Sequence, residues 1–118
     1  MGISYNIDTD GGIVYAFAEG TIGLEEIQAF RKKLFAEPNF SSELLTIIEY
    51  RMSSIKLSEK EAEALAIILP AKRTRKVAII ATGPGRKTVL QYKNFVKGKS
   101  TVEVFTDLGS AKKWVTSD

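Results

Sequence analysis

Two runs of mostly apolar residues constrain the fold more than any other feature of the sequence. One run spans Leu44 to Ile48 and the other spans Lys76 to Ala81. Both have strand length and neither alternates between apolar and polar residues, which is typical of central strands covered on both faces. Because segments with helical spacing precede and follow them, we expect strands that alternate with helices around a largely parallel sheet.

The remaining segments supply a hairpin, four helices and a closing strand. Apolar residues alternate with polar ones over 3–7, and the turn-forming stretch 8–12 leads to a second strand at 13–18. Helical spacing and stop signals indicate four helices, at 24–35, 59–69, 86–97 and 108–115, and one last strand at 101–105. Asp107 is expected to cap the last helix. The predicted fold is therefore α/β, with a single mixed, mostly parallel five-stranded sheet and four helices in the order β-β-α-β-α-β-α-β-α. One domain spanning residues 1–118 accommodates it.

The chain contains no histidine and no cysteine. Without them, serine–histidine and cysteine–histidine nucleophiles are excluded, as are thiolate metal sites and ordinary zinc sites. An enzyme of this composition would depend on carboxylates, lysine, tyrosine or backbone donors. We therefore expect a protein that is not an enzyme and that has neither a metal site nor a cofactor.

The net charge of +3 is distributed unevenly along the chain. The first 59 residues carry nine acidic and five basic side chains, whereas the remainder carries five acidic and twelve basic ones. This polarity can attract acidic partners, although an ordinary solvated surface also explains it. The N-terminal residues do not resemble a secretory signal, and no apolar stretch is long enough to span a bilayer, so a cytoplasmic protein is expected.

The order of these elements, together with four short motifs, resembles that of the STAS domain (sulphate transporter and anti-sigma factor antagonist). The motifs are GTIGLEE at 20–26, AEPNF at 36–40, VFTDL at 104–108 and Trp114. The sequence is most similar to the SpoIIAA-like branch of small stand-alone bacterial proteins, which also resemble the SEC14 lipid-binding fold. The resemblance covers nearly the whole chain, and it implies a fold more than a function.

The sequence departs from this family at its phosphorylation motif. Phosphorylatable members carry an Asp-Ser-Ser-Gly-like stretch, and the corresponding segment here is 55–61, in which Ser58 occupies the phosphoserine position. Glu59 and Glu61 would repel a phosphate there. Ser58 and Glu61 instead have the spacing of a capping box at a helix start, so the sequence favours a cap over a phospho-switch.

The strongest local candidate for a ligand site follows the second apolar run. Its residues would combine the N–H groups of a helix N-terminus with two cations, a combination that attracts anions; they are Thr82, Gly83, Gly85, Arg86, Lys87 and Thr88. The stretch lacks the glycine that a phosphate-binding P-loop requires before its lysine. A plain turn with two exposed cations is the alternative.

Three other groups of residues carry weaker functional hypotheses. The basic run 72–76 lacks interleaved aromatic residues, so we expect a solvated loop and no contact with nucleic acid. Glu49 and Tyr50 end a strand, but no partner at a defined spacing supports acid–base catalysis. A patch for homodimerisation would form if Tyr92, Phe95 and Val96 were exposed, although the sequence favours burial of most of this surface in the core.

Two functional hypotheses follow from the sequence. The first is a non-enzymatic regulatory or protein-interaction module, self-associating as a homodimer, whose partner protein the sequence does not identify. The alternative is a carrier of a small-molecule or lipid-like anion that uses the loop 82–88. An enzyme is the least favoured of the three classes.

Overall fold

The structure, a computed structural model, describes residues 2–68, 74–96 and 101–117. The strands are β1 (Gly2–Asp8), β2 (Ile13–Ile22), β3 (Leu45–Glu49), β4 (Ser53–Ile55), β5 (Lys76–Ile80) and β6 (Thr101–Phe105). The helices are α1 (Leu24–Phe35), α2 (Glu59–Glu63), α3 (Pro84–Val96) and α4 (Leu108–Val115), and a π-helical turn, η1 (Ala64–Ile68), continues α2.

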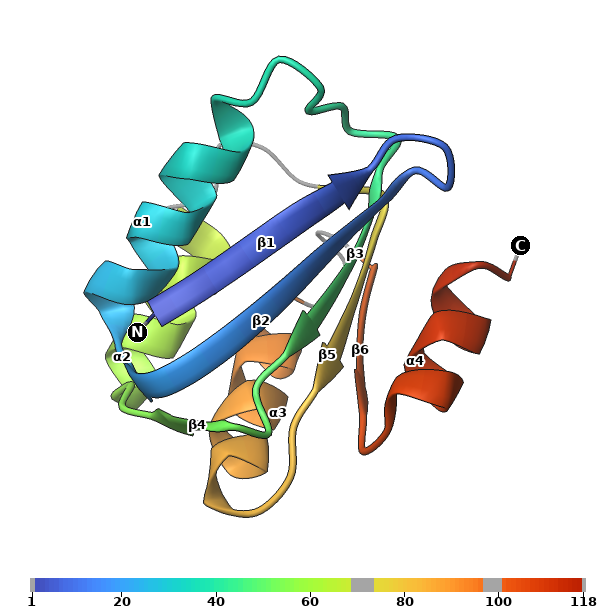
Figure 1. Cartoon of the computed structure of the whole chain (residues 1–118). Coiled ribbons are helices and arrows are strands. Elements are labelled where there is room, and N and C mark those ends of the chain that lie inside the picture. The colour runs from blue at the N-terminus through green and yellow to red at the C-terminus, as the bar shows by residue number, and fades with distance from the viewer. Residues whose placement is uncertain (1, 69–73, 97–100, 118) are drawn as a thin grey trace.

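The strands form one mixed sheet in the order β1-β2-β3-β5-β6 (Figure 1). β1 is antiparallel to β2, and every other pair is parallel, as the sequence predicted. The prediction was wrong about the end of β2: residues 20–22, expected in a connector, continue this strand and pair with β4. β4 is a sixth strand that the sequence did not indicate, because three residues are too few to show a period.

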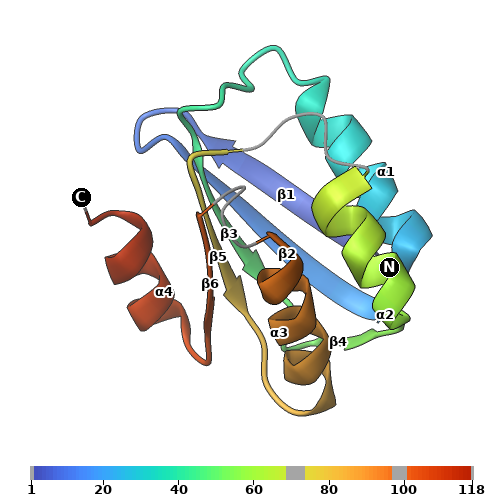
Figure 2. The ribbon, with the colours of Figure 1, turned by 180° about the vertical axis from the view of Figure 1, so that it is seen from behind.

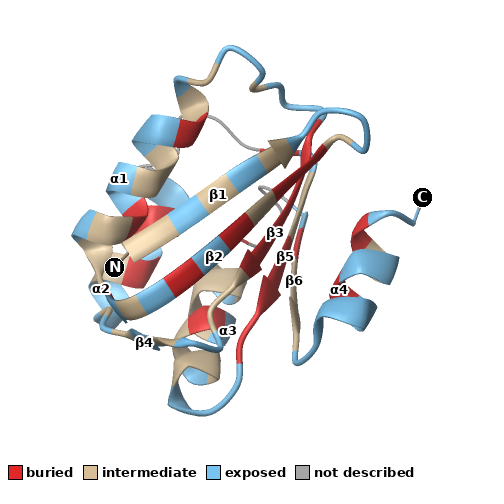
Figure 3. Ribbon diagram, in the orientation of Figure 1, coloured by how far each residue is buried: buried red, intermediate tan, exposed pale blue. Residues whose placement is uncertain are grey.

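Helices cover both faces of the sheet, but unequally. Figures 1 and 2 show α1, α2 and α3 on one face and α4 alone on the other. The predicted central strands are confirmed: residues 45–48 of β3 and 78–80 of β5 are buried, and Figure 3 shows the two strands in red between the layers. The cover on both faces explains why neither run alternates in polarity.

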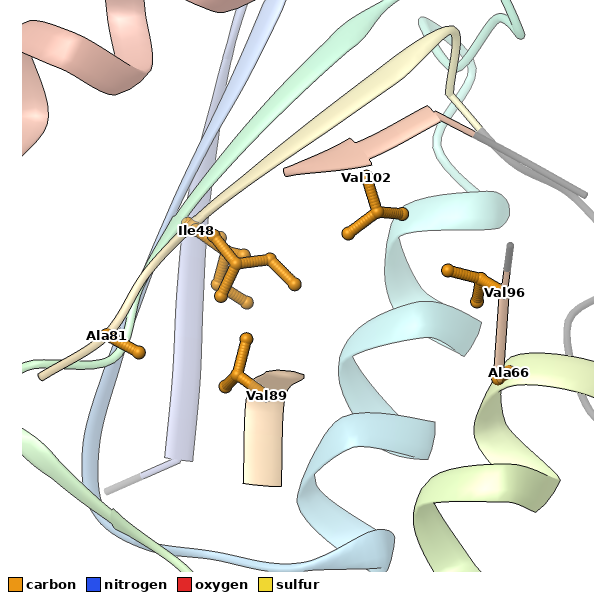
Figure 4. Close-up of a cluster of buried hydrophobic side chains, with 8 residues drawn as sticks. Ile48, Ala66, Ala81, Val89, Val96 and Val102 are labelled. Carbon is orange, nitrogen blue, oxygen red and sulfur yellow. The ribbon is translucent and has the colours of Figure 1, made fainter. Parts of the chain in front are cut away.

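The two faces of the sheet carry separate hydrophobic clusters. Ile48, Val89 and Val102 belong to the cluster on the three-helix side, which Figure 4 shows in close-up. Ile80 and Val115 belong to the cluster under α4. Successive side chains of a strand point to opposite faces, so β3 and β5 contribute to both clusters at once.

Several helix ends follow the chemistry that the sequence predicted. The hydroxyl of Ser58 accepts a hydrogen bond from the backbone N–H of Glu61 at 3.1 Å, and the Glu61 carboxylate accepts from the backbone N–H of Ser58 at 2.9 Å. Asp107 caps α4 by accepting from the backbone N–H of Ser110. α3 begins at Pro84, two residues earlier than predicted, since proline suits a first helical turn. The expected end of the second helix at 69–70 lies outside the described residues.

Candidate functional site

A cavity of about 110 Å³ lies between the sheet and the three helices on its more heavily covered face. Its wall includes side chains from α1, β3, β4, η1, β5 and α3, and Ile48 and Val89 of Figure 4 are among them. Eleven of the seventeen lining residues are apolar. The polar ones are Arg31, Thr46, Tyr50, Thr74, Thr88 and Tyr92. An apolar pocket with a few convergent polar groups is the usual form of a small-molecule site.

Among the described residues of the cavity wall, the charged group is the guanidinium of Arg31. It extends from α1, where it lies four residues after Ile27 and therefore on the same inward face of the helix. Its Nη1 donates to the backbone carbonyl of Leu65 at 2.8 Å, and its Nη2 donates to the hydroxyl of Tyr92 at 2.9 Å. One arginine thus connects α1 to η1 and to α3.

Two phenols accompany this cation. Burial raises the pKa of Tyr50 well above its ordinary value, the neighbouring Tyr92 raises it further, and Arg31 lowers it by less. The Tyr50 hydroxyl therefore keeps its proton at neutral pH and is available as a hydrogen-bond donor. The guanidinium carbon of Arg31 lies 5.9 Å from the centroid of the Tyr92 ring, which adds a cation–π contact.

A pair of buried threonines forms another polar part of the wall. Thr46 lies on β3 and Thr74 precedes β5, and their hydroxyl oxygens are 2.8 Å apart. Because the Thr74 hydroxyl donates its proton to the carbonyl of Lys76 at 3.2 Å, the proton between the two threonines must come from Thr46. These hydrogen bonds give each hydroxyl a partner in a buried environment, since Thr46 is 5% exposed and Thr74 is 7% exposed.

The predicted anion loop lies at the carboxyl end of β5, as expected, and only its last residue reaches the cavity. Thr82, Gly83 and Lys87 are exposed, and Thr88 contributes to the cavity wall. Arg86 is half-buried. Its Nη1 lies 3.5 Å from the backbone carbonyl of Ala81, the residue just before this loop.

At two positions of the loop 82–88 the structure requires glycine, one for its backbone conformation and one for close packing. Gly83 has a φ of +65°, in the left-handed region that favours glycine. A β-carbon on Gly85 would lie 3.2 Å from Ile55 Cδ1, so this glycine lets α3 approach β4. The loop's role in binding an anion stays a prediction.

The other candidates of the sequence analysis lie in different surroundings. Ser58 is exposed and its side chain forms the cap of α2. The Glu49 carboxylate forms an ion pair with Arg51, whereas the adjacent Tyr50 lines the cavity, so these two residues do not form an acid–base pair. Tyr92 is half-buried against the core, with its ring in the cavity wall. Lys72 and Arg73 of the basic run lie outside the described residues.

Sequence reasoning missed the role of Arg31, although a signal was present. Residues 27, 31 and 34 have the spacing of one buried helix face, and a cation at the central position of such a face needs a partner. The two threonines carried no such signal, since their contact joins positions 28 residues apart.

No group of three or more acidic side chains that could hold a metal ion is found in residues 2–68, 74–96 and 101–117. Within the same part of the chain, no helix is long and apolar enough to cross a membrane.

Comparison with known proteins supports the fold and leaves the function open. The sequence matches no model of a known protein family, and a search of curated proteins found no significant match. Among solved structures, the chain is similar to an uncharacterised protein of the DUF3478 family with a SpoIIAA-like fold, from Shewanella loihica PV-4. The similarity covers 97% of this chain and 94% of that one, with a TM-score of 0.63 and 19% sequence identity. The chain therefore has a SpoIIAA-like fold, as the resemblance in sequence predicted.

Proposed function

We propose that this protein is a non-enzymatic binding module that takes a small, largely apolar molecule into the cavity between the sheet and α1, η1 and α3. The observation that carries this proposal is the cavity itself, which has an apolar wall and polar groups only at a few positions. A concave, largely apolar space of about 110 Å³ with a few convergent polar groups is the usual form of a small-molecule site.

This proposal is the carrier alternative of the sequence analysis, moved to a different site. Thr88 is the residue of the loop 82–88 that reaches the cavity, and Lys87 is exposed, whereas the cavity combines a largely apolar wall with Arg31. Burying an apolar molecule yields roughly 25 cal/mol per Å² of apolar surface removed from water. A ligand would therefore gain more from the cavity than from the loop.

Methyl NMR spectroscopy with toluene as the probe tests the proposal. We expect saturable shifts of the methyl signals of Ile48, Ile79 and Val89, which line the cavity. Ile80 and Val115 lie under α4 on the opposite face and should keep their positions, so each spectrum contains its own control. Absence of a saturable shift with toluene, or equal shifts on both faces, would contradict the proposal.

A matched pair of variants separates cavity binding from general effects on the core. Val89→Ile adds a methylene to a residue of the cavity wall, and Val102→Ile adds the same group to a residue of the same cluster outside that wall. The two positions are equally buried, with 5% and 6% exposed. We expect Val89→Ile to weaken toluene binding several-fold and Val102→Ile to leave it unchanged.

A second function, a regulatory protein-interaction module, is supported by exposed apolar side chains near one end of the sheet. Met52 and Leu108 are 67% and 47% exposed. Their loops are adjacent, because Arg51 donates to the backbone carbonyl of Thr106. Self-association through this region predicts a concentration-dependent dimer in analytical ultracentrifugation that Met52→Glu abolishes, and a monomer at all concentrations would exclude the homodimer.

A further inference from the structure

The charge of the cavity wall identifies the chemical class of the proposed ligand, an inference that depends on the proposed function above. Arg31 is the charged residue among the seventeen that line the cavity, and both of its hydrogen-bond acceptors, the Leu65 carbonyl and the Tyr92 hydroxyl, are neutral. The ion pairs between described residues join Arg51 to Glu49 and Lys93 to Glu103, and neither includes Arg31. Among residues 2–68, 74–96 and 101–117, therefore, no carboxylate pairs with the guanidinium in the cavity wall.

An unpaired cation next to an apolar wall is costly, because a low dielectric surrounding stabilises it poorly. The cost falls when an anion enters and pairs with the guanidinium. Since Arg31 is the one charged residue among the described residues of the wall, a ligand with a single negative charge neutralises it. A phosphate monoester, with close to two negative charges at neutral pH, would leave an excess negative charge in the cavity.

The donors around Arg31 suit a carboxylate. A guanidinium has five N–H groups, and the two contacts within the protein leave up to three of them for a ligand. The hydroxyl of Tyr92 accepts from Arg31 and keeps its own proton to donate. Tyr50 adds a second neutral phenol in the same wall. A carboxylate can accept several such bonds through its two oxygens, and arginine binds it with two parallel ones.

The volume of the cavity limits the rest of the ligand. A cavity of about 150 Å³ with aliphatic and aromatic walls holds one benzene molecule in an engineered protein. The cavity here, at about 110 Å³, is of the same order. Its apolar space therefore matches one aromatic ring or a short branched chain, and most of a long acyl chain would extend beyond it.

We infer that the ligand is a compact monocarboxylic acid with an apolar body about the size of one ring, bound with its carboxylate on the guanidinium of Arg31. Benzoate and phenylacetate are suitable probes of this class. Benzamide is the matched neutral probe, because it has the shape of benzoate and no charge. Palmitate tests the limit of size.

Isothermal titration calorimetry of the whole chain at neutral pH tests the inference. We expect benzoate to bind at least tenfold more tightly than benzamide, and palmitate to bind no better than benzoate. Arg31→Gln should remove the tenfold preference for benzoate over benzamide. Lys32→Gln removes an exposed cation from the neighbouring position of α1 and should leave both affinities unchanged.

Three results would overturn the inference while the proposed function stands, provided that toluene still binds in the cavity. They are equal binding of benzoate and benzamide, a preference that survives in both Arg31→Gln and Arg86→Gln, and a preference that is lost in Arg86→Gln but kept in Arg31→Gln. If toluene does not bind in the cavity, the proposed function itself is wrong. The comparison of benzoate with benzamide on the unmodified protein decides the question even if Arg31→Gln does not fold.

Discussion

The directional hydrogen bonds between Thr46 and Thr74 give unequal costs for two chemically identical substitutions. Thr46 donates to Thr74, which in turn donates to the carbonyl of Lys76. Thr74→Val leaves the buried hydroxyl of Thr46 without its acceptor, so we expect a loss of roughly 2 kcal/mol in the free energy of unfolding. Thr46→Val removes one neutral hydrogen bond and leaves Thr74 with its carbonyl acceptor, so the expected loss is about 1 kcal/mol.

The double variant provides the decisive measurement. Thr46→Val/Thr74→Val removes both hydroxyls together, so no donor is left without an acceptor in this pair. We expect its loss to be close to that of Thr74→Val alone, roughly 1 kcal/mol less than the sum of the two single losses. Urea unfolding followed by circular dichroism measures all four proteins. If the losses add within about 0.3 kcal/mol, or if Thr46→Val costs more than Thr74→Val, the deduced direction of the hydrogen bonds is wrong.

Three further predictions concern the cavity wall, a helix cap and alkaline pH. Leu65→Ala, at a residue only 1% exposed, should lower the free energy of unfolding by about 3 kcal/mol in urea titrations, whereas Leu90→Ala, at 37% exposure, should cost less than about 1 kcal/mol. Ser58→Ala should cost about 1 kcal/mol through the lost cap of α2, and no change in the melting temperature would contradict the capping box. The folded state raises the pKa of Tyr50 above its ordinary value of 10.0. The protonated phenol therefore makes its full contribution to the free energy of unfolding below pH 10, and this contribution decreases as the pH rises further. Tyr50→Phe should therefore flatten the loss of stability above pH 10, and an unchanged pH profile would contradict this reasoning.

The fold was predictable from the sequence to the extent that local patterns specify it. The apolar runs predicted β3 and β5, because a central strand buried on both faces has no polar face. Ser58 and Asp107 indicated helix starts, because their side chains can cap backbone N–H groups. β4 was missed because its three residues form a strand only by pairing with the extension of β2.

The candidate site was much less predictable, because its contacts join distant parts of the chain. Arg31 reaches a carbonyl 34 residues away and a hydroxyl 61 residues away. The carbonyl of Leu65, which accepts from Arg31, lies in the π-helical turn η1. Five residues are too few for the sequence to show a π-helical spacing of apolar residues. Local sequence instead indicated the loop 82–88, where glycines, cations and a helix start are consecutive.

Because helices lie on both faces, the sheet separates the side that holds α1, α2 and α3 from the side that holds α4 (Figures 1 and 2). α4 holds one side with a cluster centred on Ala78, Ile80 and Val115, and this cluster contains no residue of the cavity wall. Adjustments of α1 or α3 around a guest molecule therefore do not require α4 to repack. If the cavity binds a ligand as proposed, substitutions in its wall that alter selectivity leave the cluster under α4 untouched, because the two sets of residues do not overlap.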